Sequence, residues 1–364
     1  MSDARSCPDL DCGVVAPRIA LADYRPRPQV RVPETRVERP AVRAIDAHNH
    51  LGRWLTEWVR PGGGWMVEDV PGLLALMDAL DLEAVVNLDG RWGEELEANL
   101  DRYDRAHPGR FLTFCHVDWA GVDRPEQLVA SLEASAQAGA RGLKVWKDLG
   151  LGVRDERGEL VLPDDPRLAA LWDAAGELGV PVLIHTADPI AFWQPADELN
   201  ERVEELAVHP EWAVGPGMPS FERLMEALEA VVAAHPATTF IGAHVCCCAE
   251  DLAWVGRMLS TYPNLLMDFS QRVAELGRQP RGARALFVEH ADRVVFGTDE
   301  LPPGRAAYET YFRFLETADE HFPYSPDPDN RWPQGRWYVS ALDLPADTLR
   351  AIYRDNALRV FGRL

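Results

Sequence analysis

Cysteine is scarce in this chain, with six residues in 364, and half of them are adjacent at positions 246–248. Disulfide-stabilised scaffolds carry paired cysteines at a much higher density, so the sequence excludes that class and indicates reduced thiols. Cys7 and Cys12 have a spacing that does not match a zinc knuckle, and we assign them to a loosely held terminus.

Long hydrophobic runs are absent as well. The first residues, MSDARSCPDLDCG, have neither the basic nor the apolar region of a secretory signal, and no segment has the apolar length that spans a bilayer, so a cytoplasmic protein is expected. Basic residues are also outnumbered, because 37 Lys and Arg face 58 Asp and Glu, for a formal net charge of −21. Phosphates repel such a surface, so nucleic acid and anionic membranes are excluded as partners and a small-molecule substrate is expected.

The composition is that of one large globular domain with an unusual beginning. Hydrophobic residues make up 47% of the chain and charged residues 26%, which is typical of a soluble protein, and 364 residues suit a single α/β barrel. Residues 1–40 differ, since they contain RPRPQVRVPETRVERP, and proline favours extended chain over helix or ladder. We predict an extended arm over 1–40, lying on the barrel or on a partner subunit, and a barrel domain over 41–364.

From residue 42 onward, short β-branched runs alternate with longer amphipathic segments, which is typical of repeated βα units. The eight predicted strands are 42–48, 83–89, 111–117, 141–147, 180–186, 238–244, 264–270 and 293–299. The main predicted helices are 70–80, 124–139, 166–179, 220–235 and 250–262, with a closing helix within 343–362. Eight such units predict an α/β fold of the (β/α)8 TIM-barrel type, with the chemistry at the carboxyl ends of the strands.

The segment IDAHNHLG ends the first predicted strand and places His48 and His50 on one face. Alone, such a pair fits either a metal site or two solvated histidines. Five of the ten histidines, however, fall at predicted carboxyl ends of strands: His48, His50, His116, His185 and His244. This gathering favours a metal-binding barrel, although a shift of one residue would turn His116 away from the site.

Ligand chemistry then suggests an assignment. The imidazoles of His48, His50 and His185 with the carboxylate of Asp299 form a nitrogen and oxygen set that suits zinc first, and also manganese, iron or cobalt. Such an ion lowers the pKa of a bound water to about 7 or polarises a substrate oxygen. Asp299 is predicted to act as ligand, as proton shuttle or as both, and His244 as a catalytic acid or base, with a buried core histidine as its alternative.

Two long insertions follow the first and fifth strands, at 53–69 and 186–220. They carry the aromatic residues Trp54, Trp58, Trp65, Phe192, Trp193 and Trp212, and we predict that they form lids over the catalytic end. Cations and aromatics near strand ends are predicted to bind substrate, and the candidates are Lys144, Arg91, Arg272, Trp54 and Trp146.

Taken together, IDAHNH, VLIHT, FIGAH, VVFGTD and the closing NALRVFG resemble the amidohydrolase-related metal-dependent hydrolases, in the branch that contains aminocarboxymuconate semialdehyde decarboxylase. The resemblance covers about residues 42–364. It implies metal ligation by His48, His50, His185 and Asp299, with His244 as catalytic histidine or additional ligand, and Asp46 matches the acidic residue ahead of the histidine pair. With the Pro-rich arm, it also favours a homodimer.

Two features depart from, or complicate, this resemblance. In other amidohydrolases a carboxylated lysine of the fourth strand bridges two metals, whereas this branch usually has one metal, which leaves Lys144 to bind a substrate carboxylate. The family also has small or polar residues where this chain has Cys246, Cys247 and Cys248. Those thiols either pack as small apolar groups or reach the metal.

Two enzymatic functions follow. The first is a metal-dependent hydrolase that attacks an amide, lactone or related carbonyl through metal-activated water. The alternative is a non-oxidative decarboxylase of a small aromatic or unsaturated acid at the same site. A barrel kept only for binding would require the loss of ligands, which the sequence does not show.

Overall fold

A computed structural model of the chain describes residues 19–20, 23–24, 28–56, 62–327, 330 and 332–362. The chain divides into two compact units, Met1–Val32 and Pro33–Leu364, and everything below concerns the second. Cys7, Cys12 and Trp58 lie outside the described residues, as does most of the predicted arm.

Eight short parallel strands overlap the eight predicted runs, and each is shorter than the run that it overlaps. They are β1 (Ala44–Asn49), β2 (Leu82–Asn87), β3 (Phe111–Thr113), β4 (Leu143–Val145), β5 (Val182–Ile184), β6 (Phe240–Gly242), β7 (Leu265–Asp268) and β8 (Val294–Val295). Their order is β1-β2-β3 in one sheet and β4-β5-β6-β7-β8 in the other.

Backbone contacts join the two sheets into a closed barrel. Cys115 pairs with Leu143 in a parallel bridge that connects the β3 and β4 ends. On the other side, Ala47 N donates to Phe296 O at 2.8 Å, and Asp299 N donates to His48 O at 2.8 Å. The second bond ties the end of β8 to the end of β1, and so holds two predicted site residues together.

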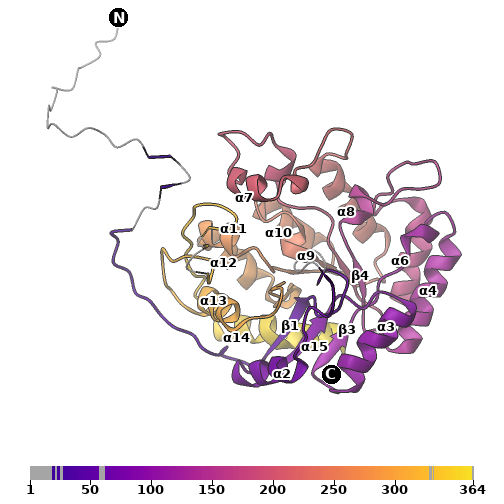
Figure 1. The fold of residues 1–364 in the computed structure, drawn as a ribbon, viewed down its shortest axis with the longest axis horizontal. Coiled ribbons are helices and arrows are strands. Elements are labelled where there is room, and N and C mark those ends of the chain that lie inside the picture. Colours follow the sequence, from indigo (N-terminus) through magenta and orange to yellow (C-terminus); the bar gives the residue numbers. More distant parts are fainter. Residues whose placement is uncertain are drawn as a thin grey trace, which may run out of the picture. The chain divides into compact units, whose positions relative to one another are not determined.

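Helices cover the outside of the strands (Figure 1). The helical segments of the described chain are α2 (Val70–Ala79), α3 (Gly93–Leu100), α4 (Pro125–Ala138), α5 (Asp148–Leu151), α6 (Ala169–Glu177), α7 (Val203–Val208), α8 (Phe221–Ala234), α9 (Ala243–Cys246), α10 (Leu252–Thr261), α11 (Val273–Arg278), α12 (Pro280–Glu289), α13 (Arg305–Glu316), α14 (Ala346–Arg350) and α15 (Asn356–Phe361). Of these, α9 is a buried left-handed turn after β6 and not part of the outer layer. Side-chain caps explain two starts: Ser220 accepts from Arg223 N before α8, and Asp251 accepts from Trp254 N before α10. Gly139, at φ 122°, ends α4.

The apolar core has two layers, one inside the barrel and one between strands and helices. Phe361 and Ala357 of α15 join the inner layer, and the Phe361 ring lies edge-on to Phe114 at 5.6 Å. The opposite, carboxyl ends of the strands carry the polar residues described below.

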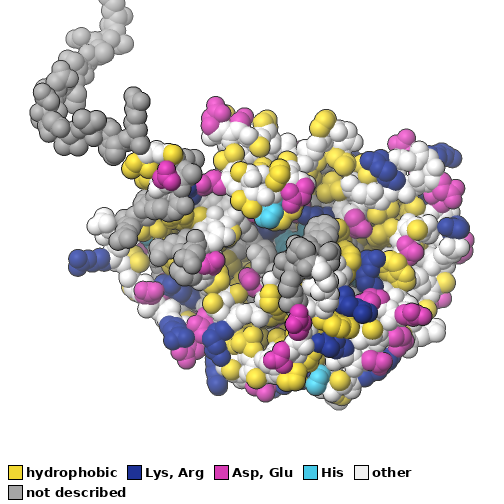
Figure 2. All heavy atoms as spheres, in the orientation of Figure 1, with side chains coloured by type: hydrophobic (Ala, Val, Ile, Leu, Met, Phe, Trp, Pro, Cys, Tyr) yellow, Lys and Arg dark blue, Asp and Glu magenta, His cyan; other side chains and the backbone are white. Residues whose placement is uncertain are grey.

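Residues 33–40, the last part of the predicted arm, and the adjoining Ala41 belong to the barrel unit and contact its helices and loops. Thr35 donates through its N and Oγ1 to the Asp319 carboxylate at 2.7 and 2.8 Å, and Ala41 N donates to Glu316 Oε1 at 3.0 Å. Acidic and basic side chains are interspersed over the face in Figure 2. No helix in the described parts of the chain has the length and apolar character to cross a bilayer.

Candidate active site

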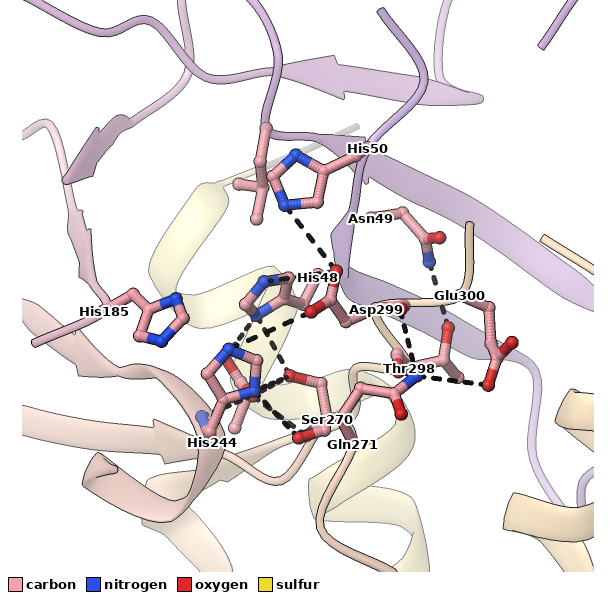
Figure 3. Close-up of polar contacts among 12 residues, drawn as sticks. His48, Asn49, His50, His185, His244, Ser270, Gln271, Thr298, Asp299 and Glu300 are labelled. Carbon is pink, nitrogen blue, oxygen red and sulfur yellow. Dashed lines mark hydrogen bonds and ion pairs between the residues drawn. The ribbon is translucent and has the colours of Figure 1, made fainter. Parts of the chain in front are cut away.

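The Asp299 carboxylate lies among three imidazoles at the carboxyl ends of the strands (Figure 3). Its Oδ1 is 3.6 Å from His50 Nε2 and 3.8 Å from His48 Nε2, and its Oδ2 is 3.9 Å from His244 Nε2. The structure thus brings together four of the five histidine and aspartate positions that the sequence assigns to metal binding or catalysis.

Each of the three imidazoles is held from behind through Nδ1. His48 Nδ1 lies 2.9 Å from Asp268 Oδ2, and His50 Nδ1 lies 2.5 Å from Asp89 Oδ1. His244 Nδ1 lies 2.9 Å from the Ser270 carbonyl, which only accepts. These acceptors favour the tautomer with the proton on Nδ1, so the Nε2 lone pairs face Asp299.

Burial favours the neutral form of His48, His244 and His185. It lowers the pKa of His48, lowers that of His244 well below the ordinary value, and lowers that of His185 to about 4. Burial acts to raise the pKa of Asp268, but its contacts with His48 Nδ1, Ser270 Oγ and His244 N outweigh burial and hold the pKa at about 2. Neutral imidazoles backed by an ionised carboxylate are the form in which histidine binds metals.

The residues fit a divalent metal. Two ligand atoms about 2.1 Å from one ion lie at most about 4.2 Å apart, and all three separations from the Asp299 oxygens meet this limit. His48, His244 and Asp299 form one compact group of possible ligand atoms, all within 4.8 Å of one another, so only a small side-chain movement is needed to bring every pair within this limit. Asp299 Oδ1 and His185 Nε2 are buried without a hydrogen-bond partner among the described residues. Such burial costs free energy unless another group, such as a metal ion, binds these atoms.

His185 lies beside this group rather than within it. Its ring is edge-on to His244 at 4.4 Å, and its Nε2 is 3.6 Å from Asp188 Oδ1. Lys147 Nζ donates to the other Asp188 oxygen at 2.5 Å. Asp188 is therefore a neighbour of the predicted ligand that sequence reasoning missed.

Asp46 fixes the frame of the site and does not face Asp299. Its Oδ1 accepts from His48 N and Thr298 N, both at 3.1 Å, and its Oδ2 accepts from Thr298 Oγ1 at 2.6 Å and Tyr308 OH at 2.7 Å. The side chain thus ties β1 to the loop after β8, directly before Asp299.

Two buried cations flank the imidazoles. Lys144 is 2% exposed with Nζ 3.3 Å from His48 Nε2, and Arg272 is 7% exposed and donates to Gln271 O at 2.9 Å. Burial lowers the pKa of Lys144 to about 8. Within the described chain, neither cation has a carboxylate oxygen within 4.0 Å.

Lys144 also lines a cavity of about 170 Å³, together with Trp54, Arg91, His116, Trp146 and Asp148. Trp54 lies edge-on to Trp146 at 5.1 Å and to His116 at 4.5 Å, and its ring is 6.2 Å from that of His50. Four of the five predicted substrate-binding residues, Lys144, Arg91, Trp54 and Trp146, thus meet in one aromatic pocket, while Arg272 lies outside its lining.

The three adjacent cysteines follow His244 in a left-handed turn. Residues 244–247 all have φ between 55° and 60°. Burial raises the pKa of Cys247 to about 11 and that of Cys248 to about 12, and Cys247 Sγ accepts from Thr186 N at 3.3 Å. The metal-capable group found among the described residues contains no thiol, so the cysteines pack as neutral buried groups.

Comparisons with known proteins find the same fold. A family model described as amidohydrolase matches residues 45–363. No curated protein matches the chain. An uncharacterised TIM-barrel protein from Bordetella bronchiseptica is 16% identical, with a TM-score of 0.57 over 88% of this chain and 98% of its own.

Two solved decarboxylases are also similar. The 2,6-dihydroxybenzoate decarboxylase from Rhizobium is 18% identical, with a TM-score of 0.57 over 88% of this chain and 98% of its own. A dihydroxybenzoic acid decarboxylase from Polaromonas sp. JS666, with bound manganese and 2-nitroresorcinol, is 15% identical, with a TM-score of 0.53 over 88% and 97%. These likenesses confirm the predicted α/β barrel.

Proposed function

We propose that this chain, which belongs to the amidohydrolase family, is a metal-dependent decarboxylase of a small aromatic acid. This reverses the order of the two functions predicted from the sequence, where hydrolysis came first. The two decarboxylases of similar fold act on dihydroxybenzoates, which supports the choice.

The observation that carries the proposal is the pair of buried cations, Lys144 and Arg272, without carboxylate partners in the described chain. A buried charge is costly unless an opposite charge compensates it. An acid substrate supplies that charge at contact distance, whereas a neutral amide or lactone leaves both cations without such a partner. Trp54 and Trp146 beside Lys144 provide the apolar surface that suits an aromatic ring.

The site residues divide the work. His48, His50 and Asp299, with His185 beside them, would hold a divalent metal, which would supply polarisation of an oxygen of the acid. Zinc or manganese suits this set of ligands, and one metal ion suffices. Lys144 and Arg272 bind the carboxylate and position it.

The chemical step exchanges a carboxylate for a proton. The bond between the ring carbon and the carboxylate carbon breaks, and its electron pair stays on the ring carbon. His244 Nε2 takes up a proton from solvent and, together with Asp299, whose Oδ2 is 3.9 Å away, passes it to this carbon, and carbon dioxide leaves.

A substrate panel tests the proposal. Zinc-loaded and manganese-loaded protein is incubated with hydroxylated benzoates and unsaturated acids, and in parallel with amides and lactones, while carbon dioxide and ring products are measured. Carbon dioxide released in equal amount to the decarboxylated product is the expected result. Hydrolysis of amides or lactones without carbon dioxide release from any acid would overturn the proposal.

A further inference from the structure

A third cation, Arg91, lines the aromatic pocket. The Arg91 guanidinium lies over the Trp92 ring at 4.1 Å and over the Trp54 ring at 5.3 Å. No carboxylate oxygen of the described chain lies within 4.0 Å of its nitrogens, although Asp118 and Asp148 also line the cavity. Its charge is therefore sheltered by aromatic faces without being neutralised at contact distance.

The polar contact that Arg91 does make adds no charge. Its NH1 is 3.4 Å from His116 Nδ1, and His116 Nε2 is 2.6 Å from Leu88 O. The carbonyl only accepts, so Nε2 carries the proton and Nδ1 accepts from Arg91. Burial lowers the pKa of His116 well below its ordinary value, which keeps the ring neutral. Arg91 thus keeps its full charge and most of its donors for another acceptor.

The backbone holds Arg91 in place at some cost. Its φ of 57° lies in the left-handed region, which costs a residue with a side chain about 1–2 kcal/mol. His116 N donates to Arg91 O at 2.9 Å and secures this conformation. The chain therefore maintains an unfavourable backbone geometry at a residue whose guanidinium lines the cavity.

The cavity is large enough for a ring. Its volume of about 170 Å³ compares with the ~150 Å³ cavity that binds benzene in another protein. Lys144 and Arg91 both line it, together with Trp54 and Trp146. A flat ring in this cavity would contact two cations: Lys144, which lies beside the metal centre, and Arg91, which lies between the tryptophans.

We propose that Arg91, with the tryptophans around it, forms a specificity subsite for a second carboxylate on the aromatic ring of the substrate. This inference rests on the proposed function. The carboxylate that is lost lies at Lys144 and Arg272, and the second carboxylate pairs with Arg91, so the preferred substrate is an aromatic dicarboxylic acid. A guanidinium binds such a group through two parallel hydrogen bonds.

The test compares the binding of benzoate and benzene-1,3-dicarboxylate to the manganese-loaded protein, by calorimetry and by tryptophan fluorescence. Wild-type protein should bind the dicarboxylate at least about tenfold more tightly, as expected for a charged hydrogen-bond pair. Arg91→Gln should bring the two affinities within about twofold while benzoate binding persists. Arg91→Lys, which keeps the charge, should retain part of the preference.

Arg102→Gln is the matched control. Arg102 also places its guanidinium over a tryptophan, Trp65, at 4.6 Å, but it does not line the cavity. This variant should keep the wild-type preference. Equal affinities of the wild-type protein for the two acids would by themselves overturn the inference. An undiminished preference for the dicarboxylate in Arg91→Gln would also overturn it.

The outcomes separate the subsite from the reaction. Preferential binding of the dicarboxylate without carbon dioxide release from any acid would reject the decarboxylase and keep the subsite. Carbon dioxide release at the same kcat/KM from monocarboxylic and dicarboxylic acids would keep the decarboxylase and reject the subsite.

Discussion

The metal centre and the aromatic pocket meet at Lys144 but are built in opposite ways. At the centre, His48, His50 and His244 each have a second partner behind the ring, supplied by Asp268, Asp89 or Ser270. In the pocket, Lys144 and Arg91 have no carboxylate partner within 4.0 Å in the described chain. The protein completes the first region from within and leaves the charges of the second for a ligand.

Removal of the central ligands should have the largest effect. His48→Gln and Asp299→Ala each delete a group that faces the shared site, so we expect activity to fall by at least about 10³-fold and metal content to fall in parallel. Elemental analysis after gel filtration measures the second effect. His235→Gln is the control, because His235 pairs with Asp173 away from the centre. Undiminished metal content in both variants would contradict the ligand assignment.

Asp268→Asn tests whether the support behind the imidazoles matters. The asparagine amide carries no charge, and it replaces one of the two carboxylate oxygens that now accept from His48 Nδ1, Ser270 Oγ and His244 N by an NH2 group, which cannot accept. We expect metal affinity to weaken by about 10–100-fold, as for other supporting carboxylates. Competition with a chelator measures it, with Asp173→Asn as the control. An unchanged affinity would show that the centre needs no such support.

The eight strands could be predicted because β-branched runs and helical periodicity alternate so regularly. Their lengths could not, since a strand ends where its neighbour stops pairing, and β8 spans only Val294–Val295. The gathering of His48, His50, His244 and Asp299 followed from strand order alone. The sequence could not show which carboxylate supports which imidazole, because that pairing depends on strand register and side-chain rotamers.

The position of Arg91 shows a further limit. Its left-handed backbone has no sequence signal, since that conformation favours glycine. His116, which a strand shift could have turned away, instead lies beside Arg91 in the cavity. The role of Asp46 was also hidden, because its partner Tyr308 lies 262 residues further along the chain.

Lys144→Met should affect substrate binding and stability in opposite directions. Loss of the cation removes a charged contact to the acid, and we expect KM to rise about 10–100-fold. Removal of an uncompensated buried charge should also raise the melting temperature of the ligand-free protein. Arg278→Gln is the control, since Arg278 is paired with Glu201. An unchanged KM would show that Lys144 does not bind the substrate.

Asp148→Asn should produce the smallest effect, visible in the pH dependence of stability. Burial raises the pKa of Asp148 to about 6, so its contribution to stability is fully present below about pH 3.8 and is lost as the pH rises through 6. The variant should therefore be more stable than wild type at pH 8, by at most about 3 kcal/mol, and similar to it at pH 4. Urea unfolding at both pH values measures this, and an equal difference at both would contradict the assigned cause.

The most direct test of the whole account is a crystal structure of the manganese-loaded protein with a slowly reacting aromatic acid, using anomalous scattering to locate the metal. We predict one manganese ion bonded to His48, His50, His185 and Asp299, with the carboxylate of the acid in hydrogen-bond contact with Lys144 or Arg272. A metal ion bound elsewhere, or an acid that leaves both cations without a partner, would contradict it.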